Sequence, residues 1–519
     1  MITKGTEIDA TRAKYKTSIE ALEQFGFVSV PKEQNPPLIW IDGIISIAEA
    51  EALLPYQRVN KIPCMDFLCF KSTMFSELNA IKSFFPTYFE FYPHTYCLPG
   101  ELPELERDHI HICNQTAVAP TWVIKPRAGS CGKGIHFIQS TQEANNITTP
   151  SIAQLLVNPF LIDKKKFDFR FYVLISSLDP LAVFIYREGI ARFCTQPYSP
   201  PSRSAGENPF SLLTNTAINK KCHDIKPEEF TRPASEVLRT VVSLKPQCSR
   251  VWDEICTATV LTIVGLYPSI IATLPLNGGA PLATKLLDPN APKLIVPRRP
   301  LWDKSSHYNF IGAQKKRAST KKRKKKIITT NTHIPNFDNN ESPKLPYDSI
   351  PVKERVLTEA QHYFHILGID IILDTEGHPM VLELNDRPSL QVTAPFELGL
   401  KESMIKEAFE HLRLDALTNG NNSNSNWQQI LPVSENSQLY MPIKAMMQHQ
   451  SGLKYYGRTS AKSPGTQRMV NAGIAADPLE VRKRIKKKEE MKSNNNNNNN
   501  NNLHQITKVT IACELPHIE

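Results

Sequence analysis

Three oxygen-bearing side chains, Asp370, Glu383 and Asn385, are the residues of this sequence best suited to hold a metal ion. Asp370 and Glu383 lie in two strand-like apolar stretches, 369–373 and 379–384, and Asn385 directly follows the second. A glycine-bearing turn separates the stretches, which therefore predict a hairpin. Carboxylate and amide oxygens are the ligands that Mg²⁺ prefers when it also holds nucleotide phosphates. A carboxylate among apolar neighbours is costly to bury unless it is paired or metal-bound. The hairpin therefore predicts a magnesium site; an edge strand with Glu383 in water is the alternative.

Two lysines, Lys125 and Lys133, are placed to meet phosphate groups. Lys125 ends a strand-like run, and Lys133 lies in a loop that also contains Gly129, Gly132 and Gly134. Small residues let backbone amides approach a phosphate, and each ammonium offsets its negative charge. The loop is not a Walker A motif, because only two residues separate Gly129 from Gly132 and a glycine follows Lys133. A phosphate-binding loop and an ordinary hairpin turn both remain open.

A third group of charged residues enters a strand-like run at 169–176. Period-two alternation places Lys166, Asp168 and Arg170 on one face of the strand and three phenylalanines on the other. A strand that presents positive, negative and positive groups over an aromatic backing is typical of a cleft wall. A solvated strand face with an ion pair along it is the alternative.

The elements that would position these side chains alternate between strand-like and helical stretches, which indicates an α/β (α+β) fold. The run 169–176 and the run 181–186 are joined by a turn with Asp179-Pro180, so a second hairpin is predicted. Helical periodicity at 352–367 precedes the carboxylate hairpin.

The stretch 258–276 carries no charge over about the length that spans a bilayer. Pro268 interrupts it, and the acidic residues after Trp252 are typical of the start of a helix. A buried helix that ends near Tyr267 is therefore predicted, and no membrane partner is expected.

Composition narrows the class of protein. The 519 residues carry a net charge of +10, which favours an acidic partner. The ten cysteines include no Cys-x-x-Cys pair, so reduced thiols are expected, and the first residues lack a secretory pattern. The expected compartment is the cytoplasm. Nucleic acid is disfavoured as a partner, because no basic strand with interleaved aromatic residues is present.

Composition shifts along the chain suggest three lobes and a tail. The expected boundaries are an N-terminal lobe at 39–115, a central lobe at 116–185, a C-terminal lobe at 186–400 with a disordered insertion at 277–347, and a low-complexity basic tail at 416–519. The runs 315–326 and 482–488 are strongly basic. They are interpreted either as contacts for an acidic partner or as a solvated linker or nuclear localisation signal.

The order of these motifs carries a family resemblance. The sequence is similar to the tubulin-tyrosine ligase-like family, of the polyglutamylase type, over roughly 39–400. The matching segments are Trp-x-x-Lys-Pro, Gly-Lys-Gly-Ile, Lys-Phe-Asp-x-Arg, Tyr-Arg-Glu-Gly-Ile-Ala-Arg-Phe, Leu-Thr-Asn-Thr-Ala-Ile-Asn-Lys, Gly-Ile-Asp and Leu-Glu-x-Asn, which end at Pro126, Ile135, Arg170, Phe193, Lys220, Asp370 and Asn385. The resemblance implies an ATP-grasp fold with N-terminal, central and C-terminal lobes.

The resemblance also assigns roles to single residues. It implies that ATP is held by Lys71, Lys125, Lys133, Gly134, Gln154, Lys166, Asp168 and Asn215. It implies that the catalytic residues are Lys133, Lys166, Asp168, Arg170 and Arg187, and that Mg²⁺ is held by Asp370, Glu383 and Asn385. Within these sets Lys71, Lys125 and Lys133 would contact phosphates, Gln154 would lie on the adenine side, and Arg187 and Asn215 would lie around the incoming amino acid and the phosphates.

The implied reaction is phosphorylation of an acceptor carboxylate by ATP, followed by attack of a free amino acid, here glutamate, on the acyl phosphate. The implied partner is tubulin with its acidic tails, in the cytoskeleton, with the cilium or basal body as a further setting. Asp386 and Arg387 stand where the family usually has small or uncharged polar residues, and this difference concerns specificity. Tyrosine or glycine ligation, a small-molecule ATP-grasp ligase, and a catalytically silent microtubule-binding protein are the alternatives.

Overall fold

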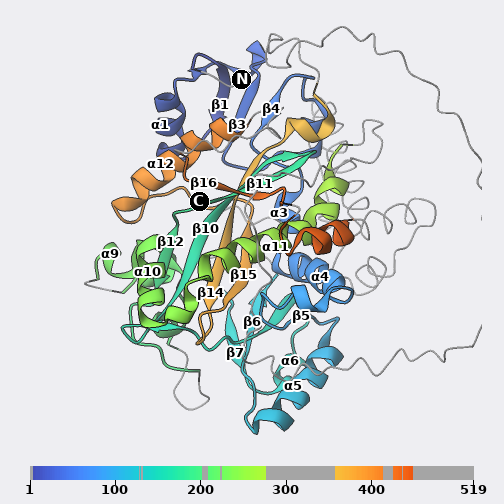
Figure 1. Ribbon diagram of the computed structural model, residues 1–519, viewed down its shortest axis with the longest axis vertical. Helices are drawn as coiled ribbons and strands as arrows, with labels where there is room; N and C mark the ends of the chain where they lie inside the picture. The colour runs from blue at the N-terminus through green and yellow to red at the C-terminus, as the bar shows by residue number, and fades with distance from the viewer. Residues whose placement is uncertain are drawn as a thin grey trace, which may run out of the picture.

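The computed structural model describes residues 4–127, 129, 132–201, 208–222, 225–275, 357–412, 425–434 and 436–447. The predicted insertion at 277–347 and both basic runs, 315–326 and 482–488, lie outside the described residues. Within the described residues the fold is mixed α/β and contains three sheets (Figure 1).

The first sheet is parallel, with the strand order β2-β1-β3-β4. Its strands are β1 Glu7–Arg12, β2 Val28–Ser29, β3 Leu38–Ile41 and β4 Arg58–Val59. The sheet thus begins well before residue 39, the predicted start of the N-terminal lobe.

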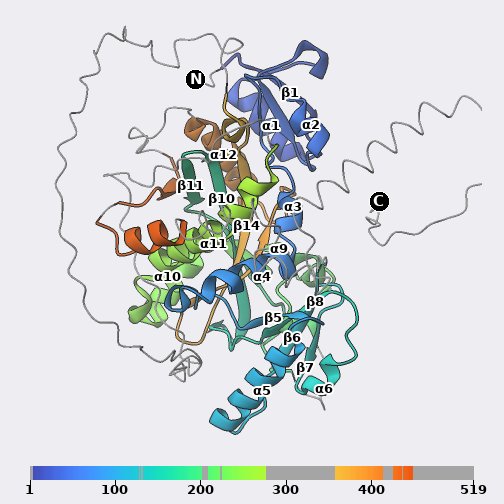
Figure 2. The ribbon, with the colours of Figure 1, turned by 90° about the vertical axis from the view of Figure 1, so that its right-hand side faces the viewer.

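The second sheet is small and antiparallel, with the order β5-β8-β6-β7. Its strands are β5 Thr95–Leu98, β6 Trp122–Pro126, β7 His136–Ile138 and β8 Ser151–Leu155. β5 precedes the predicted lobe boundary at residue 116 but pairs with β8. Figure 2 shows this sheet with α5 and α6 at the opposite end of the molecule from the first sheet.

The main sheet is built around one long strand, β10, which pairs with β9, β11, β12 and β14. Its strands are β9 Leu161–Ile162, β10 Lys165–Leu178, β11 Leu181–Tyr186, β12 Ile190–Phe193, β13 Thr231–Pro233, β14 His365–Leu373, β15 Pro379–Asn385 and β16 Trp427–Leu431. The two predicted hairpins, β10 with β11 and β14 with β15, are both present.

The helices connect and cover these sheets. The α-helices are α1 Lys16–Phe25, α2 Ile47–Glu51, α3 Met65–Leu68, α4 Lys71–Lys82, α5 Leu102–Thr116, α6 Thr141–Ala144, α7 Pro209–Leu212, α8 Thr216–Asn219, α9 Pro227–Phe230, α10 Ala234–Leu244, α11 Val251–Thr273 and α12 Phe396–Ala408. The 3₁₀ turns are η1 Lys32–Gln34, η2 Pro86–Tyr88, η3 Pro246–Cys248, η7 Glu359–His362 and η8 Phe409–His411.

The alternation of β10 divides the molecule into two faces. Odd-numbered residues such as Phe169 and Val173 join a core with α11, whereas Tyr172 and Leu174 join a separate core with α1 and α12. The even-numbered residues at the start of the strand, Lys166 to Arg170, continue the second face beyond that core. After the register shift between Ile175 and Ser177 the alternation changes, and Leu178 joins the first core. The pattern that gives the strand its polar face therefore also decides where apolar packing stops and the site begins.

Arg58 joins the first sheet to the main sheet. Its guanidinium donates hydrogen bonds to the carbonyls of Gln361, Leu412 and Ser176, at 3.0, 2.7 and 2.9 Å. These acceptors come from segments far apart in the chain. A buried guanidinium needs such partners, and here they hold β4 against η7, η8 and β10.

Three predicted features differ from the structure. α11 continues past Tyr267 to Thr273 and contains Pro268. It passes a length and composition test for crossing a membrane, but 83% of its apolar window is buried inside the protein. Tertiary packing on all sides therefore stabilises a helix that proline would otherwise end.

The predicted helix at 352–367 is also wrong in its described part, which forms η7 and then β14. In addition, β16 lies within the predicted low-complexity tail and pairs with β11. Its residues Ile430 and Leu431 are buried in the main core. The cysteines that the structure describes are all free, in line with the expectation of reduced thiols.

Candidate functional site

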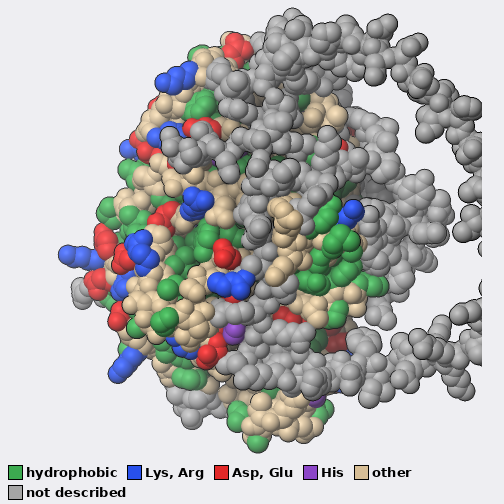
Figure 3. All heavy atoms as spheres, viewed as in Figure 1, with side chains coloured by type: hydrophobic (Ala, Val, Ile, Leu, Met, Phe, Trp, Pro, Cys, Tyr) green, Lys and Arg blue, Asp and Glu red, His purple; other side chains and the backbone are tan. Residues whose placement is uncertain are grey.

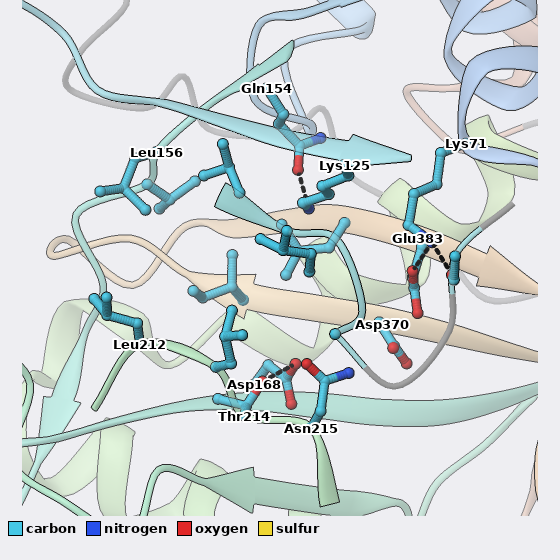
Figure 4. A pocket seen from close by; sticks show the side chains of 18 of the residues that line it. Lys71, Lys125, Gln154, Leu156, Asp168, Leu212, Thr214, Asn215, Asp370 and Glu383 are labelled. Carbon is cyan, nitrogen blue, oxygen red and sulfur yellow. Dashed lines mark hydrogen bonds and ion pairs between the residues drawn. The ribbon is translucent and has the colours of Figure 1, made fainter. Parts of the chain in front are cut away.

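A cavity of about 900 Å³, counting its open mouth, lies between the small sheet and the polar end of β10 (Figure 4). One part of its lining is apolar and comes from Val123, Phe137, Leu155, Leu156, Val157, Leu213, Ile372 and Leu382. The other part carries most of the predicted site residues: Lys71, Lys125, Lys133, Gln154, Lys166, Asp168, Asn215, Asp370 and Glu383. A flat apolar slot beside a group of cations fits a nucleotide, whose base is apolar on its faces and whose phosphates are anionic.

Two of the lysines, Lys125 on β6 and Lys166 on β10, have neutral hydrogen-bond partners. Lys125 Nζ donates to Oε1 of the buried Gln154 at 2.6 Å, and Lys166 Nζ donates to the Leu212 carbonyl at 2.7 Å. Burial lowers the pKa of Lys125 to about 8, although Glu383 partly opposes this change. Burial likewise lowers the pKa of Lys166. Both ammonium groups are thus incompletely compensated and suited to an anionic ligand.

The glycine-rich loop closes against α8. Gly132 has φ +74° and Gly134 has φ +73°, a conformation that other residues rarely adopt. A Cβ at Gly132 would lie 2.5 Å from Ile218 Cδ1 and 3.1 Å from Asn215 Oδ1. The close approach places Asn215 beside the loop that carries Lys133, so these two predicted residues share one wall of the cavity.

The two aspartates at the base of the cavity are held by two arginines. Arg192 donates to both Asp168 oxygens at 2.8 Å and also lies 2.8 Å from Asp370 Oδ2. Arg170 forms a two-pronged pair with the same Asp370 carboxylate. Thr214 Oγ1 donates a further hydrogen bond to Asp168 at 2.7 Å. Charge neutralisation and fixed geometry hold this network in one arrangement.

The pairing of β14 with β15 places Glu383 directly opposite Asp370. The register shifts at the next step, where Ile371 pairs with Val381, so Leu382 is the extra residue of a β-bulge. Both Leu382 and Glu383 line the cavity as a result. The bulge therefore turns a strand that should alternate into one that presents an apolar and an acidic group together.

Asp370 and Glu383 fit a magnesium ion only if Asn385 and the bound nucleotide supply further oxygen ligands. Among the described residues no group of three His, Cys, Asp or Glu could hold a metal. Asp370 accepts three guanidinium hydrogen bonds, which leaves it one free lone pair on Oδ1. Glu383 accepts a weak bond of 3.3 Å from Asn385 Nδ2 at Oε1 and pairs with Lys71 at Oε2. Of Asp370, Glu383 and Asn385, Glu383 is therefore the best placed to bind the ion.

Four predicted residues, Gly134, Arg170, Arg187 and Asn385, are not among the residues that line the cavity. Within the described part of the chain Asn385 reaches it only through its contact with Glu383. Arg170 lies directly behind its wall through Asp370, and Gly134 lies in the loop beyond Lys133. Arg187 is the outlier: its side chain is exposed, and its Nε lies 3.3 Å from Gln428 Oε1 near the start of β16. The structure does not bring Arg187 together with the other site residues.

Sequence reasoning gave no role to Arg192 and Thr214, although both contact Asp168. Arg192 stands directly across from Asp168 in the pairing of β10 with β12. Arg192 follows a Glu-Gly turn and lies in one of the segments that match the family, but neither signal names its partner. Its partner depended on a register that the sequence alone does not define.

The model of the tubulin-tyrosine ligase family matches residues 48–269 and 303–423 of the chain. Tubulin polyglutamylase ttll6 of Danio rerio is 29% identical over 264 residues, which are 50% of this chain and 33% of the relative. Tubulin polyglutamylase TTLL13 of Homo sapiens is 33% identical over 217 residues, 42% of this chain and 26% of the relative. A probable beta-tubulin polyglutamylase of Tetrahymena thermophila is 25% identical over 381 residues, 72% of this chain and 25% of the relative. The chain thus spans a third or less of the length of each of these relatives.

Proposed function

Because the chain belongs to the tubulin-tyrosine ligase family, we propose that it is an ATP-dependent carboxylate-amine ligase that joins glutamate to glutamate side chains of tubulin. The proposal includes an ATP-grasp arrangement of the lobes and the use of Mg²⁺. The expected setting is the cytoplasmic cytoskeleton. The polyglutamylase names of the three relatives support glutamate as the amino acid and tubulin as the acceptor.

The observation that carries the proposal is the composition of the cavity. Lys71, Lys125, Lys133 and Lys166 line it together with the carboxylates of Asp370 and Glu383. This arrangement supplies positive charge for phosphates and oxygen ligands for a divalent ion. Among the described lining residues there is no serine or cysteine that would indicate a covalent intermediate on the protein.

In the proposed mechanism the protein positions the reactants and stabilises charge. Gln154 and the apolar slot hold the base, while Lys125, Lys133 and Lys166 hold the phosphates. Glu383 and Asn385, with one lone pair of Asp370, would hold Mg²⁺, which neutralises charge on the transferred phosphoryl group.

The arginine pair keeps Asp370 ionised at the base of the cavity. Arg170 and Arg192 outweigh the effect of burial and hold the pKa of Asp370 well below its ordinary value. Asp370 is therefore an oxygen ligand rather than a proton donor at neutral pH.

The test uses the purified full chain with ATP, Mg²⁺ and tubulin, and isotope-labelled glutamate, tyrosine or glycine in parallel reactions. Transfer of glutamate alone to tubulin is the expected result. Transfer of tyrosine or glycine would replace the proposed amino acid, and transfer of none of them, with ATP still bound, would favour a catalytically silent binding protein.

The second candidate function, a ligase for a small acidic molecule, is tested in the same reactions by replacing tubulin with free glutamate or a short acidic peptide. Product formed on free glutamate but not on tubulin would favour it. The intact set of lysines and carboxylates supports an active enzyme in either case.

A further inference from the structure

A second cavity lies beside the first sheet, where the chain leaves β15. It measures about 390 Å³ including its mouth. Its apolar walls come from Trp40, Ile366, Leu390 and Ile405, with the ring of Tyr15 at one side. Its cationic groups are Lys61 and Arg387. It shares no lining residue with the nucleotide cavity.

Lys61 is buried in this cavity without a close acceptor. Its side chain belongs to a residue only 7% exposed, and in the described part of the chain its nearest polar contacts are His365 Nε2 and the Asp386 carbonyl, both at 3.5 Å. His365 Nδ1 accepts from the Ile62 amide at 3.2 Å, so Nε2 carries the proton and donates to Asp386 O at 2.7 Å. A protonated Nε2 cannot accept from Lys61. Among the described residues the ammonium therefore donates only the long hydrogen bond to the Asp386 carbonyl and has no carboxylate within ion-pair distance, which is weak compensation for a buried charge.

The other charged groups of the cavity are already committed or lie at its mouth. Asp42 accepts hydrogen bonds from the Lys14 and Tyr15 amides, from Ser18 Oγ and from Trp40 Nε1. Arg387 uses Nε for Asp386, at 2.7 Å, which leaves its two terminal NH₂ groups. Its side chain is 48% exposed. One ammonium in the depth and one guanidinium fork at the mouth form a pair of donors for a single carboxylate.

Burial also lowers the pKa of Lys61 to about 8, and Asp386 and Asp42 only partly oppose this change. An anionic ligand would restore the missing compensation. The lowered pKa of Lys61 agrees with the placement of the two cations in the cavity.

The two cavities lie along one face of β14. Ile366 lines the second cavity and Asp370 lines the first, and both have the same parity on the strand. Between them Gly368 leaves room for Arg170 Cδ and Pro388 Cβ, each 3.0 Å from where its Cβ would be. Four residues of strand correspond to roughly 13 Å. Arg170 and Pro388 thus fill the space over Gly368, and an extended peptide that passed over these two side chains would place side chains of the same parity over both cavities.

We propose that the second cavity binds the carboxylate of another acidic side chain of the acceptor, about four residues from the glutamate that is modified. The proposal rests on the proposed ligase function for its acceptor. It assigns Lys61 and Arg387 to the recognition of an acidic sequence rather than to catalysis.

The test measures binding of short fluorescein-labelled peptides by anisotropy, with a non-hydrolysable ATP analogue and Mg²⁺ present. Each peptide carries one central glutamate and a second glutamate three or four residues away on either side, in a background of glutamine and glycine. We expect a spacing of four on one side to strengthen binding roughly tenfold over the peptide with glutamine there, as for one charged hydrogen-bonded pair. Lys61→Met and Arg387→Gln should each remove most of this preference.

Arg107→Gln is the matched control, because Arg107 is exposed on α5 and, among the described residues, contacts only Glu104 and the Pro103 carbonyl of its own helix. It should keep the preference. Lys61→Met replaces an uncompensated ammonium with an apolar chain of similar length, so its thermal midpoint should not fall below that of the native chain. Circular dichroism checks that the fold is retained.

Equal affinity of the native chain for the peptides with and without the second glutamate would overturn the proposal. So would a loss of free-glutamate binding in Lys61→Met, measured by calorimetry, since it would assign the cavity to the free amino acid. Glutamate transfer is measured separately: a spacing preference without transfer would refute the ligase function alone, and transfer without a spacing preference would refute the second cavity alone.

Discussion

Lys71 Nζ lies 2.8 Å from Glu383 Oε2, so the first residue of α4 is tied to β15 across the nucleotide cavity. The same ammonium donates to the Gly129 carbonyl at 3.1 Å and thereby holds the glycine-rich loop. Glu383 is also the best placed ligand for a metal ion. The Glu383 carboxylate can therefore bind either the Lys71 ammonium or a metal ion strongly, but not both. Because Lys71 also binds the Gly129 carbonyl, the glycine-rich loop is coupled to which of the two partners Glu383 binds.

Glu383→Gln tests this role, because the amide keeps the shape of the side chain and removes its charge. We expect catalytic turnover to fall on the order of 100-fold or more, since an oxygen ligand at the reacting phosphates is lost. Stability should change by less than about 1 kcal/mol, the usual range for a partly exposed ion pair. Labelled-glutamate transfer and urea unfolding measure the two effects. Retained activity would remove Glu383 from the metal site.

Lys125 predicts a pH dependence of ATP binding. Burial lowers its pKa to about 8, and its charged form is the one that attracts phosphate. ATP affinity should therefore fall as the pH rises through 8 towards 9.5, and calorimetry at fixed Mg²⁺ measures it. Lys125→Met should bind ATP more weakly and lose most of this step, whereas Lys125→Arg should keep its charge over the whole range. A step of the same size in Lys125→Met would assign the dependence to another group.

Arg192→Gln should destabilise the fold by about 3–5 kcal/mol at neutral pH, because two buried carboxylates lose a shared partner. Burial alone would raise the pKa of Asp370 above its ordinary 3.8, and Arg170 and Arg192 hold it well below that value. The stabilisation from a carboxylate with a depressed pKa is complete above its unfolded value and is lost as the pH falls.

The native chain should therefore lose stability below about pH 4, and Arg192→Gln should lose less over that interval. Urea unfolding between pH 3 and 7 measures both curves. Arg239→Gln, at an exposed position of α10, is the control. Parallel curves for the native chain and Arg192→Gln would contradict the assigned coupling.

Lys401 and Glu397 form an ion pair of 2.7 Å in α12, with both side chains 2% exposed. Lys401 also donates to the Gln391 carbonyl at 2.7 Å, so the pair fixes the segment between β15 and α12. Lys401→Met should cost about 3–5 kcal/mol, because Glu397 is left charged and buried. Lys406→Met, on the same helix with a solvent-exposed contact to Gln24, should cost less than about 1 kcal/mol by the same urea assay.

The distribution of charged side chains on the described surface can be compared with the net charge of +10. On the face seen in Figure 3, Lys and Arg side chains are interspersed with Asp and Glu in the part that the structure describes. Both strongly basic runs lie outside that part. A role of these runs in binding acidic tails remains a prediction, which deletion of both runs and microtubule co-sedimentation at low salt would test.

Local patterns predicted much of the site. Alternation alone placed Lys166, Asp168 and Arg170 on one face of β10, and the apolar hairpin brought Asp370 opposite Glu383. Both depend on short-range regularities of a strand. The bulge at Leu382 and the partnership of Arg192 with Asp168 depend on pairing register, which distant residues determine.

The errors in the fold have the same physical origin. Pro268 was expected to end a helix, but the packing around α11 outweighs the local cost. β16 was not predicted, because the stretch around it is polar and rich in asparagine and serine. It forms a strand through its pairing with β11. β1 was missed because its alternating pattern is short and carries Glu7, Asp9 and Arg12. In each case tertiary contacts decided what local propensity left open.

The length of β10 has a consequence for motion. Its first half forms the floor of the nucleotide cavity and its second half lies in both hydrophobic cores, so the two cannot separate without breaking the centre of the main sheet. Amide hydrogens of β10 should therefore exchange only in the largest cooperative openings of the molecule. Nucleotide entry is then expected through the open mouth of the cavity, without any displacement of β10.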